Sequence, residues 1–387
     1  MRYLFPFFCL CLAMTAIAQD VPDGVPAPSN VRAREYPRIH PDRRVTFRVS
    51  APAARSVAVA ARGSDSGMNG NTPYEMKRGE DGAWQVTTDP VRPGFHYYEL
   101  IVDGFRTNDP ASQAYFGWAQ ATSGLEVPDP ELDFYSARDV PHGEVRIRWY
   151  RSRVTGEMRQ AYVYTPAEYD ANPERRYPVL YLQHGSGENQ TSWTWQGKAN
   201  LILDNLIAEG KAVPMIVVMD HGYATKPGPQ PSGSRGNEAF EEVVLKDLIP
   251  EIDRSYRTLT DRRSRAIAGL SMGGGQALRI GLGNPDTFAW VGSFSGAVRE
   301  FDRHSSFGGA LKDAEAANRR LELLWIGCGV EDRLFSAAKA FRESLAEAGV
   351  RHVWFEGPGS HEWQVWRKHF HDFAPRLFRA AREGAAE

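Results

Sequence analysis

The stretch RAIAGLSMGGG, residues 265–275, decides the fold of the second half of this 387-residue chain. Its apolar start, Arg265 to Leu270, predicts a buried strand that runs directly into Gly269-Leu270-Ser271-Met272-Gly273. A Gly-x-Ser-x-Gly pattern between a buried strand and a helical sequence is typical of a sharp turn that exposes a nucleophilic serine. We therefore predict that Ser271 is a catalytic nucleophile. The competing interpretation is a glycine-rich turn whose serine caps the next helix.

Apolar runs on both sides of this stretch alternate with helical patterns. The expected buried strands are Val179–Gln183, Met215–Met219, Arg265–Leu270, Trp290–Phe294, Leu321–Gly327 and His352–Phe355, preceded by strand-like stretches at 143–151 and 160–165. Helices are expected between them, such as Ala199–Ala208 and Glu238–Arg254. This alternation predicts an α/β fold with a doubly wound, mostly parallel sheet of the α/β-hydrolase type. We expect the active site to lie beyond the carboxyl ends of the strands of this sheet.

A serine hydroxyl needs a base to activate it, and in this fold the acid and then the histidine follow the serine along the chain. His361 lies in the loop 357–361, directly after the last expected strand, so we predict that it is the base. Other histidines fit the role less well. His352 is expected inside a strand, and His369 and His371 are expected on a solvated helix face.

The third member must be a carboxylate that orients the base. Asp332 follows the expected strand 321–327 and lies between Ser271 and His361 in the chain, so we predict that it is the acid. The neighbouring Glu331 is the alternative. A further alternative is that Asp332 only caps the helix expected to start near residue 334.

The tetrahedral intermediate of acyl transfer needs preorganised N–H donors. One is expected from Met272, the residue after the nucleophile. The second is expected from the loop His184-Gly185-Ser186-Gly187, with the backbone N–H of Ser186 first and those of Gly185 and Gly187 as alternatives. His184 itself is expected to be a structural hydrogen-bonding residue.

Aromatic residues close to these loops are candidates for substrate contact. Trp193 and Trp195 follow the oxyanion loop, and Trp363 follows the predicted base. With Gly185 they form the predicted substrate-binding set. Ordinary packing is the alternative for each tryptophan.

The N-terminal half has a different pattern. Residues 31–127 contain short alternating stretches broken by turns, including 45–49, 56–60, 83–86 and 97–102, which predict a small antiparallel β-sandwich. Two Pro-rich polar stretches, 19–30 and 128–141, are expected to be linkers. The α/β domain is expected to span 141–385.

Residues 1–18 are expected to be a signal peptide. Arg2 precedes an apolar run from Leu4 to Ile17, and Ala16-Ile17-Ala18 has the form of a cleavage site. A single membrane anchor is the alternative, but the run is short for a span. With this signal peptide, the mature protein is expected to be secreted or periplasmic in a bacterium. Cleavage near Ala18 removes Cys9 and Cys11 and leaves Cys328 as the one cysteine. The mature chain is therefore expected to have no intrachain disulfide.

Composition excludes several classes of partner. The formal net charge is −2, and no long run of lysine and arginine occurs, so no nucleic-acid partner is expected. No membrane partner is expected for the mature chain. The serine mechanism requires no metal and no organic cofactor.

These motifs taken together resemble carbohydrate esterase family 1. The resemblance covers about residues 143–380 and rests on YLQHGSGENQTSWTWQGKANLILDNLIAEG (181–210), the DLIPEIDRSYRT and AIAGLSMGGGQALRIGLGNPDTF runs within 247–288, and GCGVEDRL (327–334). The family's nucleophile, acid and base fall on Ser271, Asp332 and His361. Residues 31–127 resemble a family-48 carbohydrate-binding module, with the Asp103-Gly104 turn and Asn108-Asp109-Pro110 but no clear aromatic platform.

The resemblance implies hydrolysis of ester substituents on plant cell-wall polysaccharide or its oligosaccharides, with feruloyl esters of arabinoxylan first and acetyl esters of xylan second. A siderophore (enterochelin-type) or general carboxylesterase is the alternative within enzymes. A non-catalytic carbohydrate-binding protein is the alternative from another class. The sequence departs from the family at Asp220-His221, where Pro-Asn is common, and in an oxyanion loop with fewer glycines.

Overall fold

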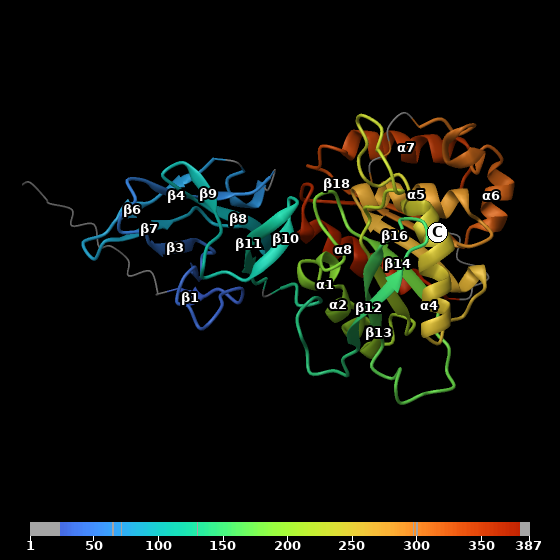
Figure 1. The fold of residues 1–387 in the computed structure, drawn as a ribbon, viewed down its shortest axis with the longest axis horizontal. Coiled ribbons are helices and arrows are strands. Elements are labelled where there is room, and N and C mark those ends of the chain that lie inside the picture. The colour runs from blue at the N-terminus through green and yellow to red at the C-terminus, as the bar shows by residue number, and fades with distance from the viewer. Residues whose placement is uncertain are drawn as a thin grey trace, which may run out of the picture.

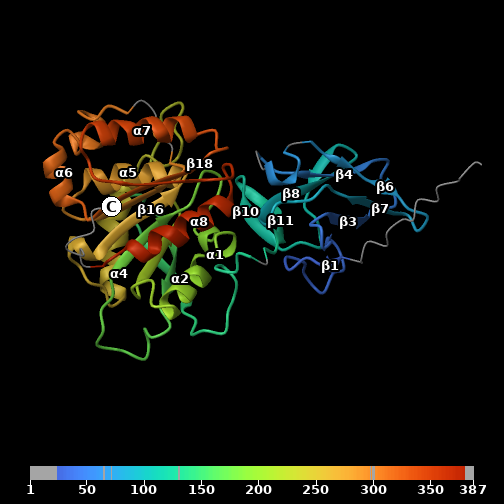
Figure 2. The same cartoon turned by 180° about the vertical axis from the view of Figure 1, so that it is seen from behind.

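The computed structural model describes residues 24–379 apart from 64, 65, 71, 130, 297, 299 and 300. Two domains lie side by side in it, a β-sandwich at the N-terminal end and an α/β domain at the C-terminal end (Figure 1; Figure 2). The predicted signal peptide 1–18, with Cys9 and Cys11, lies outside the described residues. Within the described ranges, no helix combines the length and apolar character that a membrane crossing requires.

Two antiparallel sheets form the sandwich. One has the order β1 (Val25–Pro26), β2 (Arg38–Ile39), β3 (Val45–Ser50), β7 (Ala83–Thr87), β6 (Lys77–Arg78). The other has the order β10 (Ala114–Gly117), β11 (Gln120–Val127), β8 (Gly94–Val102), β4 (Val57–Ala61), β5 (Tyr74–Glu75), with β9 (Phe105–Thr107) paired to β8. The sandwich begins earlier than predicted. Residues 24–30 are not a linker, because β1 pairs with β2 and Ala27 is buried.

Strand β8 is buried on both faces, which the alternation of its sequence does not reveal. Tyr98 packs into the core of the sandwich with Phe47. The adjacent Tyr97 joins a different cluster, which includes Trp193 and Trp363 of the second domain. The two domains therefore share one apolar core at their contact, which fixes their relative position.

The second domain is built on a sheet of eight strands among the described residues. Its order is β12 (Glu144–Arg151), β13 (Met158–Thr165), β15 (Ile216–Asp220), β14 (Val179–Gln183), β16 (Arg265–Leu270), β17 (Trp290–Phe294), β18 (Leu323–Gly329), β19 (Val353–Gly357). The first three strands pair antiparallel and the others parallel. This confirms the predicted α/β-hydrolase class, and the expected strands recur with ends shifted by up to about two residues.

Helices cover both faces of this sheet, as the continuous apolar strands require. They are α1 (Ser192–Trp195), α2 (Ala199–Ala208), α3 (Phe240–Val243), α4 (Ile249–Ser255), α5 (Met272–Gly283), α6 (Ala314–Arg320), α7 (Phe335–Glu347) and α8 (Trp363–Phe373). A π-helical segment η2 (Val244–Leu248) joins α3 to α4, and short 3₁₀ turns are η1 (Ser66–Met68), η3 (Arg262–Ser264), η4 (Ser306–Gly309) and η5 (Ala374–Arg376). Helices α3, α4, α5 and α7 pack into one apolar cluster and α2 and α8 into the other.

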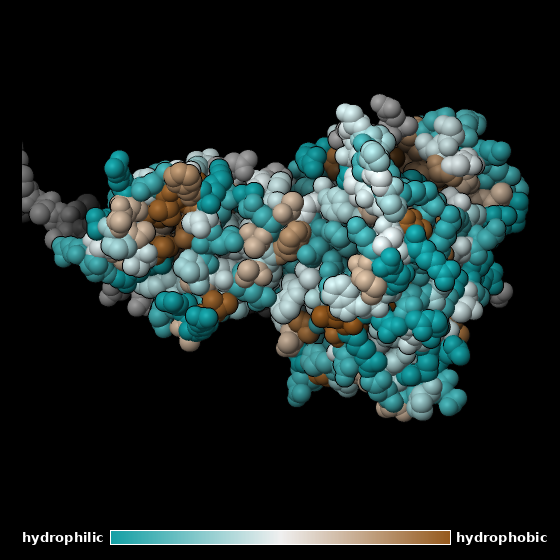
Figure 3. Space-filling view, viewed as in Figure 1, coloured by the Kyte–Doolittle hydropathy of each residue, from teal (hydrophilic) through white to brown (hydrophobic). Residues whose placement is uncertain are grey.

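The surface gives no sign of a large apolar docking face on the side shown in Figure 3. Hydrophilic residues cover most of that face over both domains, and hydrophobic residues gather there only in small separate patches. Small scattered patches are ordinary for a soluble surface.

One histidine prediction is wrong. His369 in α8 is not on a solvated face, because α8 packs against the sheet and also against β8 of the sandwich. Its imidazole is 1% exposed, and the rings of Trp325 and Phe355 lie with their centroids 5.4 Å from it. Neither ring nitrogen has a hydrogen-bond partner among the described residues. Burial lowers the pKa of His369 to about 3.

This buried imidazole predicts acid sensitivity. Below its ordinary pKa of 6.5 the unfolded chain binds a proton that the folded chain excludes, so stability is full above pH 6.5 and is lost as the pH falls towards 3. Replacing His369 by Leu should remove this loss. We expect the free energy of unfolding of the parent to fall relative to His369→Leu by about 1.4 kcal/mol per pH unit between pH 6 and pH 4, measured by chemical denaturation.

The matched control is His304→Gln, which changes an exposed histidine of the same domain. Its stability should follow the parent at every pH. Parallel pH curves for the parent and His369→Leu would contradict the assignment of a neutral buried imidazole.

Candidate active site

Ser271 occupies a strained turn between β16 and α5. Its backbone has φ 51° and ψ −114°, outside the conformations that non-glycine residues ordinarily adopt. The flanking glycines make the turn possible. A Cβ on Gly269 would lie 2.6 Å from the backbone of Gly273, and a Cβ on Gly273 would lie 2.5 Å from the carbonyl oxygen of His184. The turn raises the hydroxyl above the carboxyl edge of the sheet, where a nucleophile must stand.

The structure brings the three predicted catalytic residues together. Nε2 of His361 lies 2.8 Å from Oγ of Ser271, and Nδ1 of His361 lies 2.8 Å from Oδ2 of Asp332. With the Nδ1 proton donated to the carboxylate, Nε2 is free to accept the proton of the serine. The ring of His361 also stands edge-on to Trp366, with centroids 5.0 Å apart, which restricts its rotation.

The carboxylate partner is Asp332 and not its neighbour. Asp332 follows β18, and its second oxygen accepts the backbone N–H of Leu334 at 2.8 Å. Burial alone would raise the pKa of Asp332, but the hydrogen bond and charge of His361 and the Leu334 N–H outweigh it and hold this pKa below its usual value. Glu331 instead forms an ion pair at 3.1 Å with Arg92 of the sandwich. Asp332 therefore stays ionised beside the base.

The hydrogen bonds of the oxyanion loop show which of its backbone N–H groups is available to bind an oxyanion. The N–H of Gly185 donates to Oε2 of Glu188 at 3.2 Å, and the N–H of Gly187 donates to Oη of Tyr223 at 2.8 Å. No described residue takes the N–H of Ser186, and the same holds for Met272 in the first turn of α5. Ser186 and Met272 are the predicted pair, and both line the space beside Ser271.

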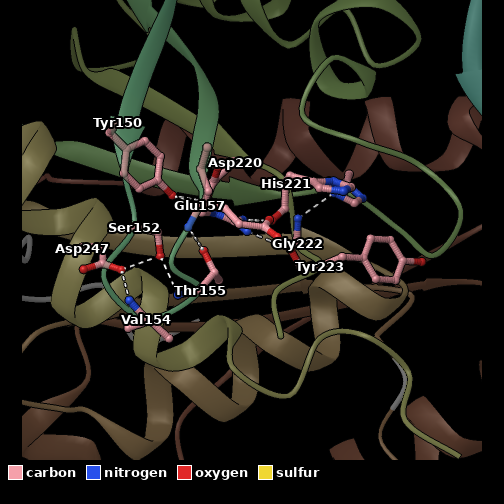
Figure 4. Close-up of polar contacts among 12 residues, drawn as sticks. Tyr150, Ser152, Val154, Thr155, Glu157, Asp220, His221, Gly222, Tyr223 and Asp247 are labelled. Atoms are coloured by element: carbon pink, nitrogen blue, oxygen red, sulfur yellow. Dashed lines mark hydrogen bonds and ion pairs between the residues drawn. The ribbon is translucent and has the colours of Figure 1, made fainter. Parts of the chain in front are cut away.

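Tyr223, which the sequence analysis did not single out, holds the oxyanion loop from one side. Its loop is fixed in turn by the buried Arg159, whose guanidinium donates to the carbonyl oxygens of His221 and Tyr223. The same guanidinium contacts the carboxylate of Asp220 at 3.1 Å and the hydroxyl of Tyr150 at 3.0 Å. Figure 4 shows the side chains of Tyr150, Asp220, His221 and Tyr223 within this group of polar contacts.

Asp220 and His221, which stand where Pro-Asn is common in the family, are part of the network that holds the oxyanion loop. Neither residue lines a cavity beside Ser271. Asp220 is fully buried and accepts a hydrogen bond from Tyr150 at 2.7 Å. The ring of His221 stacks on that of His184, with centroids 5.6 Å apart. Burial lowers the pKa of His184 to about 3, so its neutral ring donates to the Gly185 carbonyl and accepts the N–H of Gly222. This is the structural role expected for His184.

Glu188 is a second residue that the sequence analysis missed. Its carboxyl is buried between the domains and accepts hydrogen bonds from Tyr97 of the sandwich at 3.1 Å and from Trp363 at 2.9 Å, besides the Gly185 N–H. Burial, opposed by these donors, raises the pKa of Glu188 to about 7. Its only sequence signal is its place three residues after Gly185.

Two cavities meet at Ser271. One, of about 310 Å³, lies between the domains and has an aromatic lining of Phe95, Tyr97, Trp118, Trp363 and Trp366. The other, of about 770 Å³, lies along the first turns of α5 and is more polar, and its lining includes Arg235, Arg279 and Arg333. Ser186, Ser271 and Arg333 belong to both. A substrate can therefore extend from Ser271 in two directions.

The predicted substrate contacts are partly wrong. Gly185 and Trp363 line the smaller cavity, as predicted. Trp193 does not, because its indole is 1% exposed, donates to the carbonyl of Gln183 and packs beneath the site. Trp195 is partly exposed but lies outside the lining of both cavities. The short helix α1 turns these two side chains away from the nucleophile.

Comparisons with known proteins identify the family of the chain. Residues 152–377 match the Esterase family model, described as "Putative esterase", and the chain belongs to this family. A relative from Xylanibacter ruminicola named endo-1,4-beta-xylanase/feruloyl esterase is 39% identical over 92% of the chain, which spans 48% of that protein's length. The chain thus covers about half of this relative.

Solved structures give the same picture. The ferulic acid esterase AmCE1/Fae1A of Anaeromyces mucronatus, a member of carbohydrate esterase family 1, matches at 30% identity and a TM-score of 0.55, over 64% of this chain and 96% of that one. The enterobactin esterase FES of Shigella flexneri matches at 21% identity and a TM-score of 0.63, over 87% and 92%, which shows likeness of fold alone. The resemblance to family 1 is confirmed, while that of residues 31–127 to a carbohydrate-binding module stays a prediction.

The geometry predicts unequal roles for two adjacent carboxylates. Asp332→Asn should lower kcat for p-nitrophenyl acetate by about 10⁴-fold, because the amide cannot hold His361 in the productive tautomer or stabilise its charged form. Glu331→Gln, the matched control, should leave kcat within about twofold, since it breaks only an exposed ion pair. Equal losses in the two variants, measured by steady-state kinetics with circular dichroism as a check of folding, would contradict the assignment.

Proposed function

We propose that this member of the esterase family hydrolyses feruloyl esters of plant cell-wall polysaccharide. The observation that carries the proposal is the cavity of about 310 Å³ beside Ser271 with its aromatic walls. Ligand cavities of roughly 300 Å³ and more enclose ring-sized groups, and aromatic walls suit a phenolic ring and its propenoyl arm. An acetyl group would leave most of this apolar surface uncovered. The feruloyl esterase name of the Xylanibacter relative supports the same substrate.

In the first half-reaction, Oγ of Ser271 attacks the ester carbonyl carbon while Nε2 of His361 takes the serine proton. The carbonyl oxygen becomes negative and accepts hydrogen bonds from the N–H groups of Met272 and Ser186. Asp332, held ionised by its surroundings, stabilises the imidazolium. Collapse of the intermediate breaks the bond to the sugar oxygen, which takes the proton from His361 and leaves as the alcohol.

In the second half-reaction, water replaces the alcohol. Nε2 of His361 removes a proton from the water as it attacks the acyl-Ser271 carbonyl, and the same two N–H groups hold the negative oxygen. Return of the proton to Oγ frees the serine and releases the carboxylic acid. The mechanism uses only side chains and backbone groups already placed around Ser271.

The second cavity favours one other candidate. Among the described residues its lining includes three arginines, one of them shared with the first cavity, and no carboxylate, and it opens from the same serine. A catecholate trilactone carries negative charge next to its ester bonds and would be attracted to such a lining. Siderophore-type hydrolysis is therefore the second candidate.

We also propose that the protein is exported and that its signal peptide is cleaved near Ala18. This part of the proposal rests on the sequence pattern of residues 1–18.

An ester panel tests the proposal. The parent should hydrolyse methyl ferulate with a kcat/KM roughly 100-fold above that for methyl acetate, because burial of the aromatic ring stabilises the bound state. Ser271→Ala should lose at least roughly 10⁴-fold on every substrate. Acetylated xylan and a catecholate trilactone complete the panel. Activity on acetylated xylan alone, or on the trilactone alone, would overturn the feruloyl assignment in favour of that ester.

A further inference from the structure

The turn between β10 and β11 of the sandwich has an unusual backbone. Gly117 pairs with Gln120, so Trp118 and Ala119 form a two-residue hairpin turn, and their φ angles are 58° and 60°. Positive φ at both positions defines a type I′ turn, which asparagine and glycine favour strongly. Tryptophan and alanine are strained there, and strain of this kind collects at functional sites when the surroundings hold it in place.

The surroundings of this turn lie partly in the other domain. The N–H of Ala119 donates to the carbonyl oxygen of Gly187 in the oxyanion loop at 2.7 Å. The approach is close, because a Cβ on Gly187 would stand 3.2 Å from Ala119 N and from Trp118 Cα. Gly187 is therefore held on both sides, by Tyr223 through its N–H and by the sandwich through its carbonyl.

Trp118 belongs to the lining of the cavity beside Ser271, and its indole lies against Gly63 of the sandwich. Room for its ring depends on Gly63, where a Cβ would lie 2.1 Å from the indole. The residue is 49% exposed and lines the aromatic cavity that also contains Ser271. A ligand that enters the cavity would cover the exposed apolar surface of this side chain. Removing that surface from water would stabilise the bound state.

We propose that this turn makes the sandwich part of the active site, with Trp118 as a specificity-determining residue that stacks on the aromatic ring of the acyl group. Ala119 is its positioning partner, because its N–H anchors the oxyanion loop through Gly187. The inference rests on the proposed function, since it assigns the acyl group to the cavity between the domains. It gives the sandwich a role in choosing the ester that does not depend on polysaccharide binding.

The test distinguishes the effect of losing the indole from the effect of changing the conformation of the turn. Replacing Trp118→Asn together with Ala119→Gly installs the residues that a type I′ turn prefers and keeps the N–H at position 119. We expect Tm to stay or rise and KM for methyl ferulate to rise about tenfold, with a smaller change in kcat for methyl ferulate than in KM. Trp118→Phe, which keeps an aromatic face, should restore most of the KM.

Phe105→Ala is the matched control, because Phe105 is an exposed aromatic of the same sandwich sheet that lines neither cavity. Its kinetics should equal those of the parent. A double variant whose KM for methyl ferulate stays within twofold would overturn the role of Trp118 while leaving the proposed function intact. A parent that fails on methyl ferulate in the same assay would refute the proposed function and this inference together.

Discussion

The catalytic arrangement depends on one strained residue, Ser271, whose backbone bends the chain from strand β16 into helix α5. A conformation of this kind costs on the order of 1–3 kcal/mol and persists only where the surroundings hold it. Here β16 lies between β14 and β17 inside the sheet, and the serine N–H donates to the carbonyl of Phe294 on β17. Position and direction of the hydroxyl are therefore set by the sheet, before any substrate arrives.

The partners of Ser271 come from elements that the same sheet brings to one edge. Asp332 follows β18 and His361 follows β19, so parallel pairing places both beyond the carboxyl ends of adjacent strands. The oxyanion loop follows β14 on the other side of β16. It is held by hydrogen bonds, with Tyr223 on one side and Ala119 of the sandwich on the other. The site is thus preorganised from two domains, which favours stabilisation of a developing oxyanion.

Much of the catalytic set could be predicted, because its signals are local. A loop or turn after an apolar strand carries each of Ser271, Asp332 and His361. The chain order serine, acid, histidine limits which carboxylates and histidines can be the acid and the base. The rest depends on which surfaces cover one another. The sequence pattern predicts a solvated position for His369, but this face of α8 packs against Trp325 and Phe355 of the sheet. The roles of Tyr97 and Trp118 follow from the contact between domains, which no periodicity within either domain encodes.

The central claim is that Ser271 is the activated nucleophile of this cleft, and covalent labelling tests it most directly. The protein would be treated with a fluorophosphonate, which modifies serines activated by a neighbouring base, digested and mapped by mass spectrometry. We expect one stoichiometric adduct, on the peptide that carries Ser271, and loss of esterase activity in proportion to labelling. An adduct on another serine such as Ser186, or full esterase activity after Ser271 is labelled, would contradict it.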